Sequence, residues 1–150
     1  MFIAGFTGVL GRLIELDPVV LVWHRMTWAA ALMALFLVLR KEMQRFRFKD
    51  VARMGGVGVL LCLHWIFFYA SIKASNVSIG VVCFSLVGFF TALLEPIINR
   101  HRFSVREFLF SILTVCGVYL IFQFDTQYRL GIALGIVSAA LYALFAIATQ

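Results

Sequence analysis

The chain has 150 residues, of which 63% are hydrophobic and 13% are charged. A soluble domain usually has about 45–50% apolar and about 25% charged residues, so this composition excludes a water-soluble core and predicts an integral membrane protein. The net charge of +6 also suits nucleic-acid binding, but most basic residues lie in two short segments between apolar runs, Arg40–Asp50 and Asn99–Glu107. Such segments are typical of cytoplasmic loops that face anionic lipid headgroups. We therefore expect the lipid bilayer, and no nucleic acid, as a partner.

The apolar runs predict an all-α integral membrane bundle with six spans. The first run, Met1 to about Leu16, is shorter than one crossing, so we expect a short first span whose start is missing or truncated. Each of the others has close to the roughly 17–25 residues that cross a bilayer as a helix. They are Pro18–Leu39, Val51–Ile72, Val77–Ile98, Phe108–Phe124 and Leu130–Gln150. Because Gln150 ends an apolar run without polar flanking residues, we expect the chain to be a fragment of something longer.

The loop charges predict the orientation of these spans. The basic segments 40–50 and 99–107 join the second span to the third and the fourth to the fifth, so both are expected in the cytoplasm. The other connections, ELDP, KASN and DTQYR, are nearly neutral and are expected outside. The sixth span then starts on the opposite side from the first. A repeated unit that began there would be inverted, as is common in secondary transporters.

The second span contains a charge at an unexpected place, His24 and Arg25 within VLVWHRMTW. An arginine at the centre of a span costs roughly 2.5–3.5 kcal/mol on insertion scales, so it is usually near an edge, partnered or hydrated. Arg25 lies near the outer start of the span and can reach the headgroups by snorkelling. Thr27 and Trp28 on nearly the same face as His24 favour the alternative, that Arg25 lines a cavity. The residues leave both interpretations open.

The third span has an aromatic and polar stripe, with Trp65, Tyr69 and Lys73 at four-residue intervals and His64 beside it. The fourth span has a small or polar line typical of a helix edge that faces a cavity or a close neighbour: Ser78, Ser85, Gly88, Ala92 and Glu95. Pro96 can kink this helix.

Glu95 has two interpretations. It is either an interfacial carboxylate paired with Arg100 or Arg102, or a group that couples transport to protons.

The last span carries small residues at four-residue spacing, which predicts close helix packing: Gly131, Gly135, Ala139 and Ala143.

The three cysteines, Cys62, Cys83 and Cys116, lie in different spans without a CxxC pair and are expected to be packing residues. No GxxxxGK[ST], GxSxG or HExxH motif occurs. We therefore expect no enzyme, no metal site and no cofactor. Two histidines on facing helices, His24 and His64, could hold a haem iron, but the sequence contains no other haem-binding signal to support this hypothesis.

Two stretches carry a family resemblance. WIFFYASIKASNVSIGVVCFSLVGFFTALLEPII, followed by the basic loop and REFLFSILTVCGVYLIF, resembles the EamA-like branch of the drug/metabolite transporter superfamily. The resemblance implies half of a ten-span transporter of two inverted five-helix repeats, with residues 1–128 as the first repeat and 129–150 as the opening helix of a missing second one. The family often has a glutamate in the loop after the fourth span, where this chain has His101, so no family role is carried onto Glu95.

These observations together predict a secondary membrane transporter, a permease that moves small polar or aromatic metabolites by alternating access. The expected cavity-lining residues are His24, Arg25, Trp28, His64, Trp65, Tyr69 and Ser85. Cationic and aromatic groups favour anionic or zwitterionic solutes, such as amino-acid-like compounds. A missing second half, or a second copy of the chain, is expected to be needed for function. The alternative is a membrane scaffold or assembly subunit that does not transport.

Overall fold

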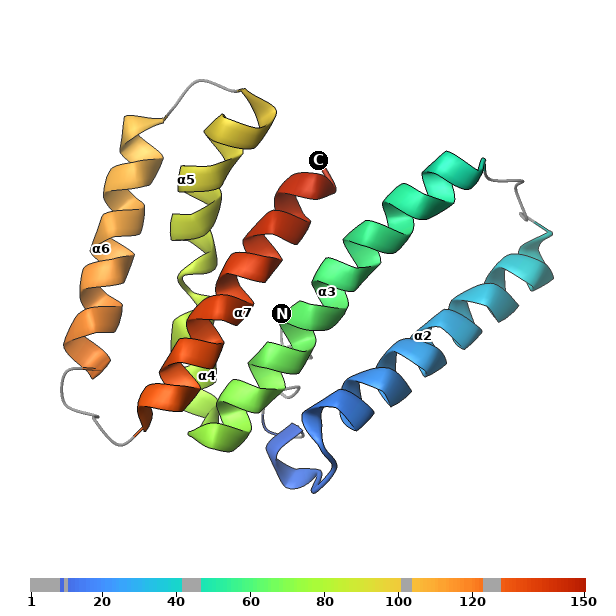
Figure 1. Cartoon of the computed structure of the whole chain (residues 1–150), viewed down its shortest axis with the longest axis horizontal. Coiled ribbons are helices and arrows are strands. Elements are labelled where there is room, and N and C mark those ends of the chain that lie inside the picture. The colour runs from blue at the N-terminus through green and yellow to red at the C-terminus, as the bar shows by residue number, and fades with distance from the viewer. Residues whose placement is uncertain (1–8, 10, 42–46, 101–103, 123–127) are drawn as a thin grey trace.

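The computed structural model describes residues 9, 11–41, 47–100, 104–122 and 128–150 (Figure 1). Within these ranges the elements are helices and no strand occurs: α2 (Pro18–Arg40), α3 (Phe48–Ala74), α4 (Val77–Phe84), α5 (Val87–Asn99), α6 (Val105–Phe122) and α7 (Arg129–Ala148). Five stretches are long and apolar enough to cross a membrane, with α4 and α5 together forming one of them. The prediction of an all-α multi-span protein is confirmed. Of the short first span, residues 1–8 and 10 lie outside the described residues.

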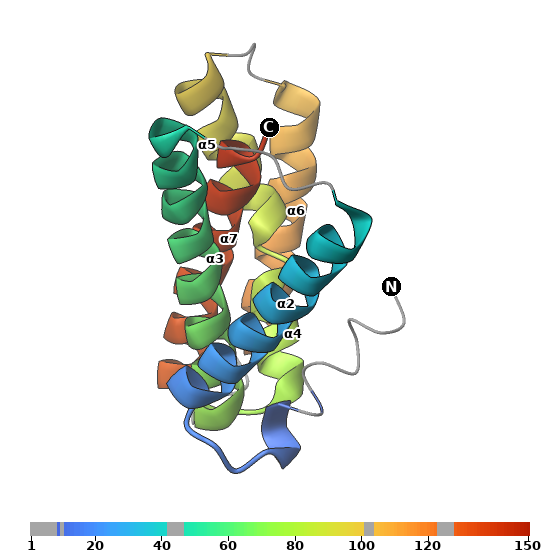
Figure 2. The same ribbon diagram turned by 90° about the vertical axis from the view of Figure 1, so that its right-hand side faces the viewer.

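Helix α7 is the centre of the bundle. It lies between α3 and the α4–α5 pair, with α6 on the outer side of α5 and α2 beyond α3 (Figure 1). The interface between α3 and α7 is the largest in the bundle. Figure 2 shows these two helices side by side along their length, while α2 crosses them obliquely. The polar residues of α3 therefore lie between two neighbours, α7 on one side and the start of α2 on the other.

The small-residue stripe of the last span makes this close packing possible. Gly131, Gly135, Ala139 and Ala143 are all buried in α7, as the four-residue spacing predicts. A Cβ atom built on Gly131 would lie 2.5 Å from Cβ of Ser75, and one built on Gly135 would lie 2.6 Å from Cβ of Cys83. Both distances are too short for carbon atoms, so only glycine fits at either position.

The fourth span is broken at Ser85, eleven residues before Pro96, the residue that the sequence marks as a kink. Both Ser85 and Leu86 donate their backbone N–H to the carbonyl three residues earlier, Val82 and Cys83 respectively, at 3.1 Å. The Ser85 hydroxyl also donates to the Val82 carbonyl at 2.6 Å. A serine that bonds back onto the preceding turn competes with the regular helix pattern and bends the chain. Pro96 lies inside α5.

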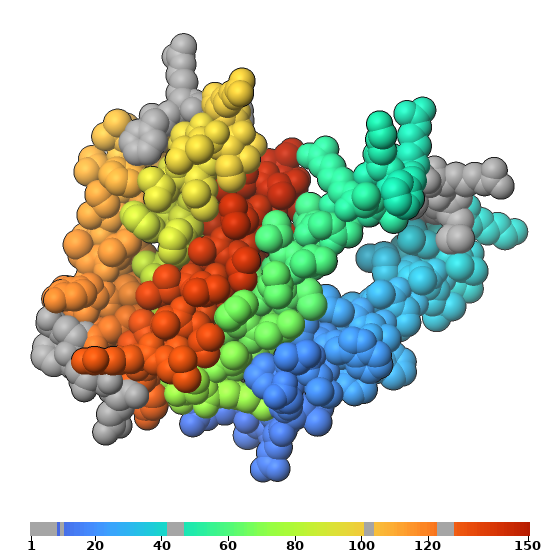
Figure 3. All heavy atoms as spheres, viewed as in Figure 1, coloured from blue at the N-terminus to red at the C-terminus, as the bar shows by residue number. Residues whose placement is uncertain are grey.

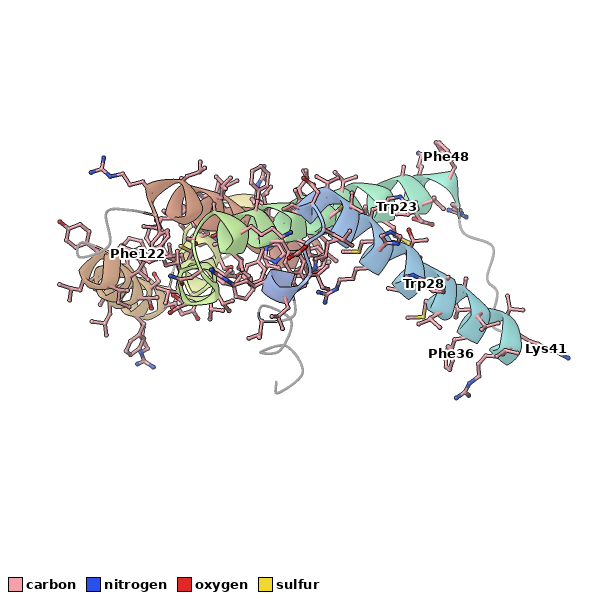
Figure 4. The ribbon with its side chains drawn as sticks, turned by 90° about the horizontal axis from the view of Figure 1, so that it is seen from below. Trp23, Trp28, Phe36, Lys41, Phe48 and Phe122 are labelled. Atoms are coloured by element: carbon pink, nitrogen blue, oxygen red, sulfur yellow. The ribbon has the colours of Figure 1, made fainter. Side chains whose placement is uncertain are left out.

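Helix α2 is packed against the bundle only near its beginning. Its buried residues are Leu21 and Val22, whereas large apolar side chains farther along are exposed, including Leu32 at 63% and Leu39 at 74%. The space-filling view shows the far half of α2 separated from α3 (Figure 3). Viewed from below, Lys41, directly after α2, is far from Phe48 at the start of α3 (Figure 4). In a bilayer this apolar surface contacts lipid or another helix.

The helix ends that flank the two basic segments lie at the same end of the bundle, at the top of Figure 1. These are the end of α2 with the start of α3, and the end of α5 with the start of α6. The start of α2 and the end of α3 lie at the opposite end, which is where the candidate site is found.

Candidate functional site

A pocket of about 320 Å³ lies at the start of α2, against the end of α3. Its volume is at the lower end of the range for small-molecule sites, about 300–1,000 Å³. The wall combines apolar side chains with one cation, one imidazole, one indole and one phenol. The lining residues are Gly11, Ile14, Leu16, Leu21, His24, Arg25, Trp28 and Tyr69.

The guanidinium of Arg25 points toward α3. Its Nη1 donates a hydrogen bond of 2.7 Å to the hydroxyl oxygen of Tyr69, and its Cζ lies 4.1 Å from the centre of the Trp65 ring. The Trp65 and Tyr69 rings are themselves stacked, with centroids 5.7 Å apart. A cation over an aromatic face is stabilised by the ring quadrupole, more strongly where water is excluded. We call these three residues the Arg25 cluster.

The four-residue spacing on α3 explains why the cluster forms. Residues four apart on a helix lie on one face, so Trp65, Tyr69 and Lys73 present a single stripe to α2 and the chain before it. The ammonium of Lys73 donates to the carbonyl of Leu16, and Arg12 Nη1 donates to the carbonyl of Ser75 at 2.9 Å. A cation that binds the last carbonyls of a helix stabilises that helix, and Arg12 does so at Ser75, directly after α3. These two bonds hold the segment before α2 beneath the pocket.

Gly11 forms part of the pocket wall by direct contact with Tyr69. A Cβ atom at Gly11 would lie 2.2 Å from Cε1 of the Tyr69 ring, so any larger residue would displace the phenol that accepts from Arg25. In the sequence, Gly11 is the last of three glycines spaced three residues apart, Gly5, Gly8 and Gly11, a pattern typical of helix packing. The close approach to an aromatic ring could not be found from that pattern.

The Arg25 cluster keeps unused hydrogen-bonding capacity. Apart from the bond to Tyr69, the guanidinium forms no hydrogen bond with any residue in the described ranges. Tyr69 accepts in that bond, so its O–H remains a donor. The side chain of Arg25 is exposed rather than buried. A bound solute could therefore receive hydrogen bonds from both side chains.

Of the predicted cavity-lining residues, the structure brings His24, Arg25, Trp28 and Tyr69 together in one pocket, with Trp65 directly beneath Arg25. His64 lies elsewhere. It is 1% exposed and packs in the contact between α3 and α7, because neighbouring positions on a helix point about 100° apart.

His64 is joined to α7 by a polar node that the sequence did not indicate. Its Nδ1 lies 2.9 Å from both the carbonyl oxygen and the hydroxyl of Ser138, and that hydroxyl donates back to the His64 carbonyl at 3.1 Å. The imidazole is also surrounded by rings, with Tyr142 nearest at 4.8 Å between centroids. Polar bonds between spans hold helices together in lipid. Ser138 was missed because nothing in the sequence distinguishes it from other serines in apolar runs.

Two further predicted residues lie away from the Arg25 cluster. Ser85 is exposed at the break between α4 and α5. Glu95 is half-buried and lines a separate groove of about 450 Å³ between α5 and α6, together with Glu107 and three hydroxyl side chains, Thr91, Ser111 and Thr114. Within the described part of the chain Glu95 forms no ion pair, and Arg102 lies outside that part.

Comparison with known proteins identifies one family. The family model described as the EamA-like transporter family matches residues 1–123, which is most of the chain. No curated protein and no solved structure gives a significant match.

Proposed function

Because the chain belongs to the EamA-like transporter family, we propose that it is a secondary carrier of small polar or aromatic metabolites that works by alternating access. The observation that carries this proposal is the Arg25 cluster. A charge that costs free energy in a membrane span lines a pocket and lies over the Trp65 ring, and intramembrane ionisable groups of this kind usually mark solute pathways. Arg25 and His24 would bind polar groups, while Trp28, Trp65 and Tyr69 would provide stacking surface.

The proposal includes an architecture. Residues 1–128 would form the first inverted repeat, and 129–150 would be the opening helix of a second one. A second half or a second copy of the chain would complete the carrier. The exposed apolar surface of α2 supports this arrangement, since that helix offers surface to further spans. The basic segments 40–50 and 99–107 would face the cytoplasm from the plasma (inner) membrane.

The groove around Glu95 supports a coupling role that remains a prediction. Glu95 is a half-buried carboxylate in a span and lies among hydroxyl groups, and intramembrane carboxylates of this kind often belong to proton relays. Glu95→Gln keeps the shape of the side chain and removes its carboxylate, so it is the variant that tests this role.

A second function, a membrane scaffold or assembly subunit, is favoured by one observation. The His64–Ser138 node shows that some polar groups in the spans serve helix contacts. A scaffold, however, gives no reason for the unused donors of Arg25.

A counterflow experiment separates the two functions. Purified chain is reconstituted into liposomes preloaded with unlabelled solute, and uptake of the same solute in labelled form is followed for a panel of anionic, zwitterionic and aromatic metabolites. A carrier exchanges at least one of them with saturable kinetics, above the rate of empty liposomes. Because a second copy is expected to complete the carrier, chemical cross-linking first establishes that the reconstituted chain is paired. Uptake equal to that of empty liposomes across the panel, in paired protein that retains its helix content by circular dichroism, would favour the scaffold.

A further inference from the structure

We infer that the pocket at the start of α2 selects carboxylates that have an apolar or aromatic body and lack an ammonium group. This inference rests on the proposed function and narrows it, because the proposed carrier is compatible with both anionic and zwitterionic solutes. The geometry separates these two classes through the kinds of hydrogen-bonding group that face the pocket.

The polar groups of the pocket wall are predominantly donors. Arg25 has N–H groups without a partner in the described ranges, and a guanidinium has no acceptor. The Tyr69 oxygen already accepts from Arg25, so the phenol offers its O–H. The Trp28 indole N–H is a donor only. A planar carboxylate accepts at two oxygens and suits the fork of an arginine, so the wall matches the carboxylate end of a solute.

The same wall provides no negative charge for an ammonium. None of the described lining residues is acidic, and the first ten residues of the sequence contain no Asp or Glu. In the sequence, the acidic residues adjacent to the lining residue Leu16 are Glu15 and Asp17. The Asp17 carboxylate already accepts from the Val19 N–H at 2.9 Å, at the beginning of α2, and Glu15 is exposed outside the lining. An ammonium brought beside Arg25 would meet a like charge without a carboxylate to offset it.

The remaining surface of the pocket favours an apolar body of modest size. Ile14, Leu16 and Leu21 line it together with the Trp28 ring, and a volume of about 320 Å³ is small among ligand sites. Gly11 brings the Tyr69 ring close to the chain before α2, which limits the room further. The fitted solute is therefore a small monocarboxylate with a ring or a short hydrocarbon chain.

Three probes that share one phenyl ring and a two-carbon chain test the inference: 3-phenylpropionate, phenylalanine and 2-phenylethylamine. They carry a carboxylate alone, a carboxylate with an ammonium, and an ammonium alone. Binding to the full chain in nanodiscs is measured by isothermal titration calorimetry, with tryptophan fluorescence as a second readout. We expect 3-phenylpropionate to bind at least tenfold more tightly than phenylalanine, and 2-phenylethylamine to show no saturable binding. Arg25→Gln should remove the binding of 3-phenylpropionate, whereas Glu15→Gln should leave the preference unchanged.

Phenylalanine binding as tightly as 3-phenylpropionate, or no binding of 3-phenylpropionate, would overturn the inference. Loss of the preference in Glu15→Gln would do so as well, because it would mean that Glu15 senses the ammonium. The counterflow experiment tests the carrier function separately from this selectivity. A chain that exchanges phenylalanine in preference to 3-phenylpropionate is a carrier with a different selectivity, whereas one that binds 3-phenylpropionate and exchanges no solute has the pocket but is not a carrier.

Discussion

Gly135→Val is expected to destabilise the chain by about 1–3 kcal/mol, the usual cost of overpacking a filled contact. A Cβ atom at this position would lie 2.6 Å from Cβ and 2.8 Å from Sγ of Cys83, and 3.0 Å from the Ser71 hydroxyl. The Cβ atom of Cys83 is fixed to the α4 backbone, so rotation of the cysteine side chain cannot relieve this contact and α7 has to move away from α4. Thermal unfolding in detergent, followed by circular dichroism, should show a clearly lower midpoint for this variant than for the parent chain.

Gly117→Val is the matched control for that variant. Gly117 is an exposed position inside α6, and a Cβ atom there would meet nothing within 4 Å. Both substitutions put the same β-branched residue in place of a helical glycine, so they share the change in helix propensity and differ in packing. Equal midpoints for the two variants would mean that the contact between α7 and its neighbours does not limit stability.

Arg25→Ala is expected to reduce exchange of the best counterflow solute by about ten- to a hundredfold. Hydrogen bonds to charged groups contribute about 1.5–3 kcal/mol, and about 1.4 kcal/mol corresponds to a factor of ten in affinity. Arg25→Lys should recover only part of the loss, because an ammonium cannot form the planar contact over Trp65 or the fork geometry of a guanidinium. Tyr69→Phe keeps the ring and the charge and should have the smallest effect of the three.

Loss of packing between α2 and α3 could also slow exchange, and Val22→Ala controls for it. Val22 is 0% exposed and packs in the same cluster as Tyr69, but it does not line the pocket. Its truncation should lower the thermal midpoint while it leaves the affinity for solute near that of the parent chain. If Val22→Ala abolishes exchange as fully as Arg25→Ala, Arg25 acts by holding α2 in place and not by binding solute.

The membrane spans could be predicted from the sequence because length and apolar content alone determine them. The structure gives five span-length stretches with bounds close to those expected. The small-residue stripe likewise predicted close packing of α7. It could not name the partner helices, since Gly131 and Gly135 give room to whichever neighbour lies opposite. The break at Ser85 was not predictable, because a serine hydroxyl that donates to the carbonyl three residues earlier also occurs in an unbroken helix, where Ser111 donates to Phe108 inside α6.

The candidate site was only partly predictable. The spacing of Trp65 and Tyr69 placed them on one face of a helix, and that face could be read from the sequence. The partner of Arg25 could not, because Tyr69 is 44 residues away and its distance depends on how α2 crosses α3. His64 illustrates the same limit. Its bond to Ser138 joins residues 74 apart, and sequence adjacency to Trp65 says nothing about which neighbouring helix it faces.

We propose that the Arg25 cluster borders a water-filled pocket that opens to the outside. A direct test uses a chain in which Cys62, Cys83 and Cys116 are replaced by alanine and single cysteines are introduced at His24 or Trp23. These neighbours lie at similar depth on α2, but only His24 lines the pocket, whereas Trp23 is 62% exposed outside it.

The measurement is the rate at which a membrane-impermeant thiol reagent, added from outside to intact cells, labels each cysteine. If water fills the pocket, His24→Cys reacts rapidly and Trp23→Cys, which faces lipid, reacts slowly or not at all. Two equally protected cysteines would contradict the account, because Arg25 would then be enclosed by lipid or by other helices with no aqueous path to a solute.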